Sequence, residues 1–339
     1  MVEQSVLLLK GRFRNCRLIM SKKILILGNG FDLDLGMKSR YRDFMASEVW
    51  KKIKEDDFTA SNCSLIRYLE KKNEIESWFD AETELLNYAL QETEGTYASS
   101  DPNDRAGFDM FRKGLKEYLK KEQDTFQLKR DSVAIKILEA IYRNEYFDEI
   151  FSFNYTDVGQ LLNKTGIHWD SKVTYMHGSL QNNDDIILGI ETDLPISKNY
   201  RFLFKTNSRF YKSNSLIESM ENANEIVFFG HSINGMDFPY FKDFFMKQVN
   251  PYEDTTRKYI TIVTYDDDSL QQIKDNFRDA GINPRDLMQR NQIWNIETKL
   301  VYEGDAHEKS ELEDLFNHLR MDCKERERQN IKRIEEMML

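Results

Sequence analysis

The chain has 339 residues, of which 40% are hydrophobic and 31% charged, and its formal net charge is −10. This composition is typical of a folded globular protein and excludes a disordered or collagen-like chain. The acidic balance disfavours nucleic acid as a partner, because phosphate backbones repel a negative surface.

The cysteines indicate a reducing compartment, and the apolar runs bear on the membrane. Cys16, Cys63 and Cys323 are far apart and lack the spacing of metal ligands, so we expect neither a disulfide framework nor a zinc site. No apolar run reaches about 18 residues, so we expect a cytoplasmic protein without a membrane span. Residues 1–20 carry their positive charges after an apolar stretch, unlike a signal peptide, and we interpret them as a disordered or mis-started extension.

The first predicted strand, Ile24–Leu27, is followed by Gly28-Asn29-Gly30-Phe31-Asp32. Two glycines after a strand permit a sharp turn whose N–H groups can approach a phosphate. In open parallel sheets, ligands bind at this end of the strands. The third glycine of the dinucleotide fingerprint is replaced by Leu33, so a purely geometric turn fits the motif equally well. Either Asp32 or Asp34 is expected to contact a ribose, unless Asp32 only caps a helix.

The middle of the chain has a helical pattern. Apolar residues recur three and four positions apart, as at Leu65, Tyr68 and Leu69, and strand patterns nearly vanish. We predict a helical insertion over 48–146 in a Rossmann-like core made of 21–47 and 147–305. Residues 306–339 are predicted to form a charged amphipathic helix that either docks on the core or pairs with another chain.

Strand patterns then return, alternating with helical ones. The alternation predicts an α/β fold with a mainly parallel, Rossmann-like sheet flanked by helices. The predicted strands are Glu149–Phe153, Val173–Met176, Ile186–Leu188, Ile226–Phe229 and Ile260–Val263. The predicted helices among and after them are Asp157–Lys164, Ser213–Asn222, Pro239–Val249 and Ser269–Ala280.

Three of these strands end in polar motifs. Asn154-Tyr155-Thr156 follows the second strand of the core, and His177-Gly178 follows the third. A histidine at such a position can serve as a general acid or base, because its pKa lies near neutral. Helix capping explains one polar residue after a strand, but not all of those in the first motif. Since parallel strands end at one edge of a sheet, we expect the motifs to converge.

The last motif is Gly230-His231-Ser232, with Asp237 five residues further on. Gly-His-Ser after a strand is similar to the nucleophile elbow of α/β-hydrolases, but Asn234 occupies the position where that motif requires glycine. A serine hydrolase is therefore disfavoured. A glycine-rich turn in which Ser232 and Asp237 form hydrogen bonds is the alternative.

Taken together and in order, these segments resemble the AbiH family of bacteriophage abortive-infection proteins. The resemblance spans about residues 22–245 and is carried by Ile24–Asp32 with Tyr41 and Phe44, Trp78–Glu82, Phe153–Thr156, His177-Gly178, and Gly230-His231-Ser232 with Asp237. It implies a role in abortive infection, in which an infected cell arrests or dies before phage mature.

The same pattern is similar, more distantly, to the sirtuin-like Rossmann fold. That comparison implies that Asn154 orients water or ribose and that His177 acts as a base. Asn29 and the pair Phe31-Asp32 depart from the small residues of the sirtuin loop, which leaves the ligand open. The sirtuin zinc module is absent from the sequence, so simple hydrolysis is a nearer analogy than protein deacetylation.

The leading hypothesis is therefore a defence effector that binds NAD or a related nucleotide and hydrolyses its N-glycosidic bond, with no metal or other cofactor required. The expected catalytic residues are Asn154 and His177. The expected ligand-binding residues are Gly28, Asn29, Gly30, Phe31, Asp32, Tyr155, Thr156, Gly178, Gly230, His231, Ser232 and Asp237.

Two alternatives stay open. One is a non-catalytic nucleotide sensor that acts through a protein partner. The other is a metal-dependent nuclease that uses Asp32, Asp34 and Asp237. A second copy of the chain and a phage-derived trigger are candidate partners, whereas a membrane is not expected.

Overall fold

A computed structural model describes residues 22–56, 62–75, 80–94, 101–142, 146–166, 173–181, 185–211, 214–253, 255–319 and 328. The predicted extension over 1–20, Trp78 and Phe79 of the family resemblance, and nearly all of the chain beyond 319 lie outside these ranges.

A six-stranded parallel sheet is at the centre of the fold, with the strand order β3-β2-β1-β4-β5-β6. This is the order of doubly wound nucleotide-binding sheets, so the predicted Rossmann-like fold is confirmed. Leu27 is level with Ser152 on one side and with Phe229 on the other, so three strands end together. The strands are β1 (Lys23–Leu27), β2 (Glu149–Ser152), β3 (Val173–Tyr175), β4 (Glu225–Phe229), β5 (Tyr259–Thr264) and β6 (Gln292–Glu297).

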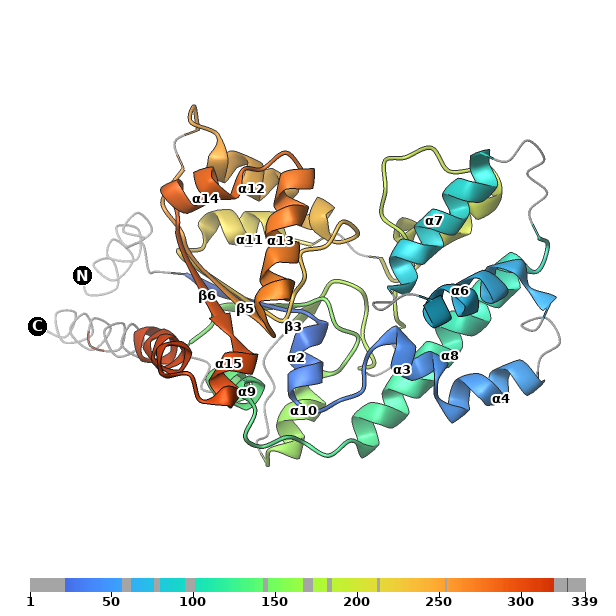
Figure 1. Cartoon of the computed structure of the whole chain (residues 1–339), viewed down its shortest axis with the longest axis horizontal. Coiled ribbons are helices and arrows are strands. Elements are labelled where there is room, and N and C mark those ends of the chain that lie inside the picture. Colours follow the sequence, from blue (N-terminus) through green and yellow to red (C-terminus); the bar gives the residue numbers. More distant parts are fainter. Residues whose placement is uncertain are drawn as a thin grey trace, which may run out of the picture.

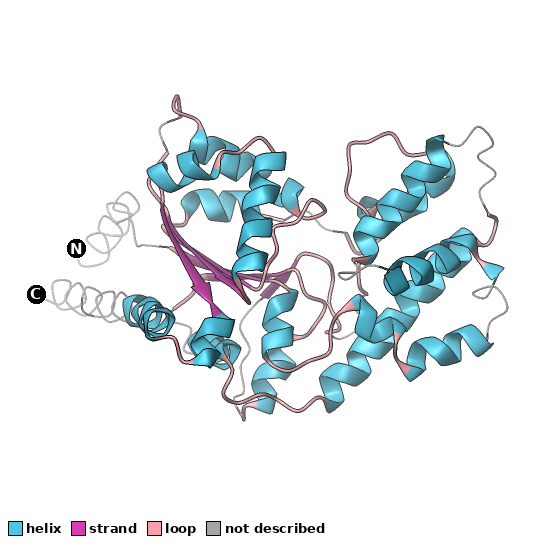
Figure 2. Ribbon diagram, viewed as in Figure 1, coloured by secondary structure: helices cyan, strands magenta, loops and turns pink. Residues whose placement is uncertain are grey.

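Helices cover both faces of the sheet (Figures 1 and 2), as the fully buried β1 requires. Ile24 and Ile26 point into one core, which is completed by α11 (Leu216–Asn222), α12 (Lys242–Val249), α13 (Asp267–Asp279) and α14 (Pro284–Arg290). Leu25 and Leu27 point into the other, where α2 (Asn29–Asp34), α9 (Val133–Tyr142), α10 (Val158–Lys164) and α15 (Thr298–Glu303) lie.

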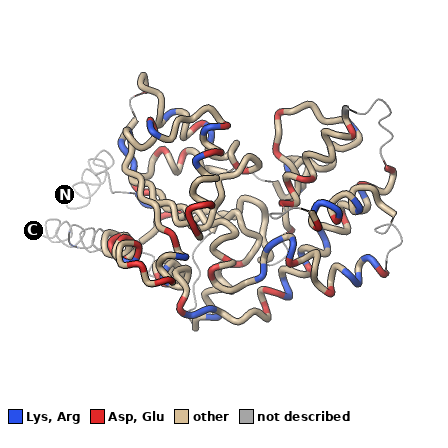
Figure 3. The backbone as a smooth tube through the Cα atoms, viewed as in Figure 1, with Lys and Arg blue, Asp and Glu red and all other residues tan. Residues whose placement is uncertain are grey.

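The helical stretch between β1 and β2 forms a lobe beside the sheet (Figure 1). Its rings pack edge to face: the centroid of Phe44 lies 5.2 Å from that of Phe111 and 5.3 Å from that of Trp50. Charges of both signs lie along most of its helices (Figure 3), as on solvated helix faces, whereas Ala81–Glu94 carries acidic residues alone. The lobe consists of α3 (Tyr41–Met45), α4 (Glu48–Asp56), α6 (Ser64–Ile75), α7 (Ala81–Glu94) and α8 (Asp104–Thr125).

The lobe and the core share one apolar interior, because Phe44 and Phe111 belong to the same buried cluster as Leu25. The helix α9 falls within the range expected for the insertion but lies against the sheet with α2 (Figure 1). The division of the chain into domains stays a prediction.

One predicted strand is not observed, and one observed strand is not among those predicted. Ile186–Leu188 was expected to be a strand, but in the described chain it forms only an isolated bridge, between Ile186 and Gly178. Gly178 has φ +73, which turns the chain back so that Ile187 N–H donates to His177 O. Conversely, the edge strand β6 (Gln292–Glu297) was not predicted. Its residues are mostly half-buried, and it lacks the apolar run by which the other strands were identified.

The C-terminal helix docks on the core over its described part. Leu312, Leu315 and Leu319 are buried against the cluster that contains Leu25. Of the two alternatives left open by its amphipathic pattern, docking on the core is therefore observed. None of the described helices combines the length and the apolarity that crossing a membrane requires.

Candidate functional site

The loops after β1 and β4 pack backbone against backbone. Gly28 N–H donates to Phe229 O at 3.0 Å, and Gly30 N–H donates to Gly230 O at 2.9 Å. A Cβ on Gly30 would lie 2.6 Å from Gly230 Cα, so only glycine permits this approach. Two of the N–H groups that we expected to hold a phosphate are thus bonded within the protein. The glycines of this turn serve the geometry of the sheet edge.

The loop after β2 joins this edge from the other side. Asn154 Nδ2 donates to Gly28 O at 2.9 Å, because β1 and β2 are neighbours in the sheet, which the sequence left open. Thr156 Oγ1 donates to Asp32 Oδ2 at 2.9 Å. Burial raises the pKa of Asp32 to about 7, although hydrogen bonds from Thr156 and Asn154 oppose the rise. Asp32 is therefore a buried carboxyl that titrates near neutral pH.

Asp34 and Phe31 have structural roles instead. Asp34 accepts a hydrogen bond from Ala134 N–H at 2.8 Å, at the start of α9, and another from the Tyr302 hydroxyl of α15. Phe31 is fully buried, with its ring edge to face on Phe229. Asp34 thus ties two helices to the end of α2, and each of its two carboxylate oxygens accepts a hydrogen bond within the protein.

A buried polar cluster lies at the carboxyl edge of the sheet. We define the polar cluster as five side chains, each less than a tenth exposed: Glu82, His177, Lys205, His231 and Asp237. Lys205 Nζ lies 2.9 Å from Glu82 Oε2 and 3.6 Å from Asp237 Oδ1. His177 Nε2 lies 3.2 Å from Asp237 Oδ1. The expected convergence of the motifs after β3 and β4 is therefore observed for His177 and Asp237.

Two members of the cluster come from segments in which the sequence indicated no catalytic or ligand-binding residue. Glu82 lies in the first turn of α7 in the helical lobe, and its only sequence indication was the family resemblance of Trp78–Glu82. Lys205 begins the 3₁₀ turn η2 (Lys205–Asn207), where its N–H donates to Ile190 O at 3.1 Å. Nothing in the sequence indicates a buried ammonium here, because an isolated lysine is usually exposed.

The hydrogen bonds of His231 define its tautomer. Ile233 N–H donates to His231 Nδ1 at 2.9 Å, so the proton of the neutral ring is on Nε2. Burial lowers the pKa of His231 to about 4, which keeps the ring neutral at physiological pH. His231 Nε2 is buried, 3.6 Å from Asp237 Oδ2, and forms no hydrogen bond within the described structure. It is an N–H donor aimed into the cluster.

The loop that carries His231 and Asp237 is strained. Ile233 has φ +46, a left-handed conformation that is rare for a β-branched residue and costs about 1–3 kcal/mol. Its N–H holds His231, and the Asn234 side chain accepts the N–H of Asp237 at 3.0 Å. The strain is thus located where the loop orients two members of the polar cluster.

The cluster holds more acids than fixed cations among the described residues. Burial alone would lower the pKa of Lys205, but Glu82 and Asp237 outweigh it and raise the pKa. Burial alone would raise the pKa of Asp237, but His177 and Lys205 hold it well below its usual range. Burial, helped by Glu82, raises the pKa of Asp80 to about 6, and burial also raises that of Glu191. Within the polar cluster, Glu82 and Asp237 therefore share the single ammonium of Lys205.

The other expected site residues take several positions. The Tyr155 and Tyr41 hydroxyls are hydrogen-bonded to each other. Burial raises the pKa of both hydroxyls, and the nearby charge of Glu82 adds to the rise. Ser232 is exposed, and its carbonyl accepts from Asn276 Nδ2 at 3.2 Å. Asn29 is also exposed and accepts from the Ser39 hydroxyl. Neither Ser232 nor Asn29 is part of the buried cluster.

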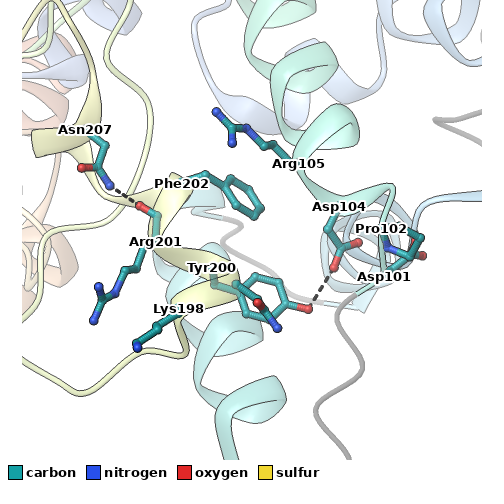
Figure 4. Close-up of a pocket in the computed structure, with 10 residues that line it drawn as sticks. Asp101, Pro102, Asp104, Arg105, Lys198, Tyr200, Arg201, Phe202 and Asn207 are labelled. Carbon is teal, nitrogen blue, oxygen red and sulfur yellow. Dashed lines mark hydrogen bonds between the residues drawn. The ribbon is translucent and has the colours of Figure 1, made fainter.

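A separate cavity of about 380 Å³ lies between α8 and the 3₁₀ helix η1 (Lys198–Leu203), as Figure 4 shows. Asp104 accepts from the Tyr200 hydroxyl at 3.1 Å, from the Tyr88 hydroxyl at 2.8 Å and from Leu65 N–H at 3.0 Å. This carboxylate joins three helices of the lobe to η1. None of the residues that line the cavity belongs to the polar cluster.

Comparison with known proteins links the chain to one family. The model of the family described as "Bacteriophage abortive infection AbiH" matches residues 24–259, a range that contains every residue of the polar cluster. No protein with a curated description matches the sequence significantly.

Proposed function

The chain belongs to the bacteriophage abortive infection AbiH family, and on that premise we propose that it binds NAD or a related nucleotide at the polar cluster and hydrolyses the N-glycosidic bond. The role in abortive infection follows from the family. What supports the finer assignment is one observation: buried carboxylates outnumber Lys205 at the carboxyl edge of a Rossmann-type sheet.

The charge of the cluster suits the transition state of this reaction. When the bond between ribose C1′ and nicotinamide breaks, its electron pair leaves with the base and the sugar becomes oxocarbenium-like. Pre-oriented negative groups stabilise such a cation most strongly where water is excluded. Asp237 and Glu82 are buried and held in place by His177 and Lys205, so they meet this requirement.

His177 is the base in this scheme. Its Nε2 faces Asp237, and Lys205 Nζ lies 3.3 Å from Nδ1 and 3.4 Å from Nε2. Glu82 and Asp237 also face the Lys205 ammonium, and in this scheme a ring nitrogen of His177 accepts a proton from water in place of the contact with Lys205. The water oxygen then bonds to C1′, nicotinamide departs, and the proton resides on His177.

His231 and Asn154 assist in different ways. The unpartnered Nε2–H of His231 would donate to a ribose hydroxyl. Asn154 was expected to orient water, but its Nδ2 donates to Gly28 O. We therefore assign to Asn154 the positioning of the β1 loop.

The test is incubation of the purified protein with NAD, followed by chromatography for nicotinamide and ADP-ribose. His177→Gln should reduce turnover by about 10²-fold or more, the usual contribution of a general base. His307→Gln is the matched control, because His307 is three-quarters exposed and far along the chain from the site residues. Parent-like turnover of His177→Gln would refute the assignment.

The burial of the polar cluster favours a second candidate, a nucleotide sensor without turnover. A closed site can retain a ligand without releasing products. Saturable NAD binding by the parent, abolished in His177→Gln and accompanied by no nicotinamide, would identify the sensor.

A further inference from the structure

Three members of the polar cluster form a donor set of the kind that binds metal ions. Glu82, His177 and Asp237 each offer one ligand atom, and these atoms lie within 4.8 Å of one another. One imidazole and two carboxylates suit divalent cations such as zinc or manganese. The three residues come from the helical lobe, from the end of β3 and from the loop after β4, so only the folded chain assembles the set.

The centre of this donor set is already occupied by a cation of the chain itself. Lys205 Nζ lies 2.9 Å from Glu82 Oε2, 3.3 Å from His177 Nδ1 and 3.6 Å from Asp237 Oδ1. Lys205 is 1% exposed, so its ammonium has little access to water. Asp237 Oδ1 is buried and faces both this ammonium and His177 Nε2, which lies 3.2 Å from it.

The distances from Lys205 Nζ to the three donors, between 2.9 and 3.6 Å, are those of an ammonium among its acceptors. The ligands of a zinc ion would lie about 2.1 Å from it. A metal ion entering here would have to displace Lys205 from Glu82 and leave a buried ammonium unpaired, which is strongly unfavourable.

We propose that the Lys205 ammonium takes the place of a metal ion among Glu82, His177 and Asp237, so that the protein itself supplies the positive charge of this site. Lys205 then acts as a positioning residue that keeps the two carboxylates and the imidazole together. Removing its side chain should leave a vacant three-donor site that a divalent cation can enter.

The experiment is a titration of metal-free protein with Co²⁺, followed by visible absorption and equilibrium dialysis. The parent should bind no stoichiometric Co²⁺. Lys205→Ala should bind one equivalent with a Kd at least tenfold lower than that of the parent, and Lys205→Ala combined with His177→Gln should lose it.

Lys258→Ala is the matched control. Lys258 is also a buried lysine, but it donates to the carbonyls of Glu221 and Ala223 near the amino ends of the strands. This variant should bind no more Co²⁺ than the parent. If Lys205→Ala does not fold, Lys205→Gln keeps part of the side chain and replaces its ammonium by a shorter, neutral amide.

Two results would overturn the proposal. One is stoichiometric Co²⁺ binding by the parent that His177→Gln abolishes, because the metal would then be the native occupant. The other is a folded Lys205 variant that binds no Co²⁺. The titration contains no NAD, so its failure is distinguishable from failure of the proposed hydrolase activity.

Discussion

Gly230→Ala tests whether the glycines at the sheet edge are required by backbone packing. Gly230 has φ +63, and an added Cβ would lie 2.4 Å from Phe31 N and 2.5 Å from Gly30 Cα, both of which are backbone atoms. The left-handed conformation costs a non-glycine residue about 1–2 kcal/mol. Forcing an extra carbon into a packed site adds about 1–3 kcal/mol. We therefore expect the free energy of unfolding to fall by about 2–5 kcal/mol.

Urea denaturation followed by circular dichroism measures this loss, with the slope m compared between variants. Gly235→Ala is the matched control in the same loop, because an added Cβ there meets nothing within 4 Å. It should change stability by less than about 0.5 kcal/mol. If Gly230→Ala were as stable as Gly235→Ala, the close packing of the β1 and β4 loops would be refuted.

Three further predictions follow from buried charges. Burial raises the pKa of Asp32 from 3.8 to about 7, so its contribution to stability is full below pH 3.8 and falls by about 1.4 kcal/mol per pH unit up to pH 7. Relative to the parent, Asp32→Asn should lack this decline in pH-dependent denaturation; an unchanged decline would contradict the assignment. Asp34→Ala should lower the free energy of unfolding by about 1 kcal/mol, because the N–H of Ala134 loses its acceptor, and any NAD turnover should be unchanged. A loss of turnover like that of His177→Gln would show instead that Asp34 contributes to the site. Lys205→Met should lower the free energy of unfolding by about 3–5 kcal/mol, because it leaves Glu82 unpaired; the double variant with Glu82→Gln should lose less than this. If the losses of the two single variants simply added in the double variant, the pair would not be coupled.

The glycine motif after β1 has two possible physical roles that its sequence alone does not distinguish. Glycines after an apolar strand predict a tight turn, and the turn is present. The same residues fit a phosphate loop and a packing contact equally well. The choice depends on whether the N–H groups of Gly28 and Gly30 find partners, and those partners, Phe229 O and Gly230 O, lie about 200 positions away in the chain.

The sequence by itself determined the α/β class, the mainly parallel sheet, and the placement of His177 and of the loop that carries Asp237 after strands whose ends lie at one edge. These features follow from hydrophobic period and from the rule that parallel strands end at one edge, both of which are local or topological. Only the tertiary structure decided that Lys205 is buried, that Glu82 reaches the site from the helical lobe, and that Asp34 is hydrogen-bonded to α9 and α15. The reason is that the cost of burying a charge depends on its partners, and packing brings those partners together from segments that are separate in the sequence.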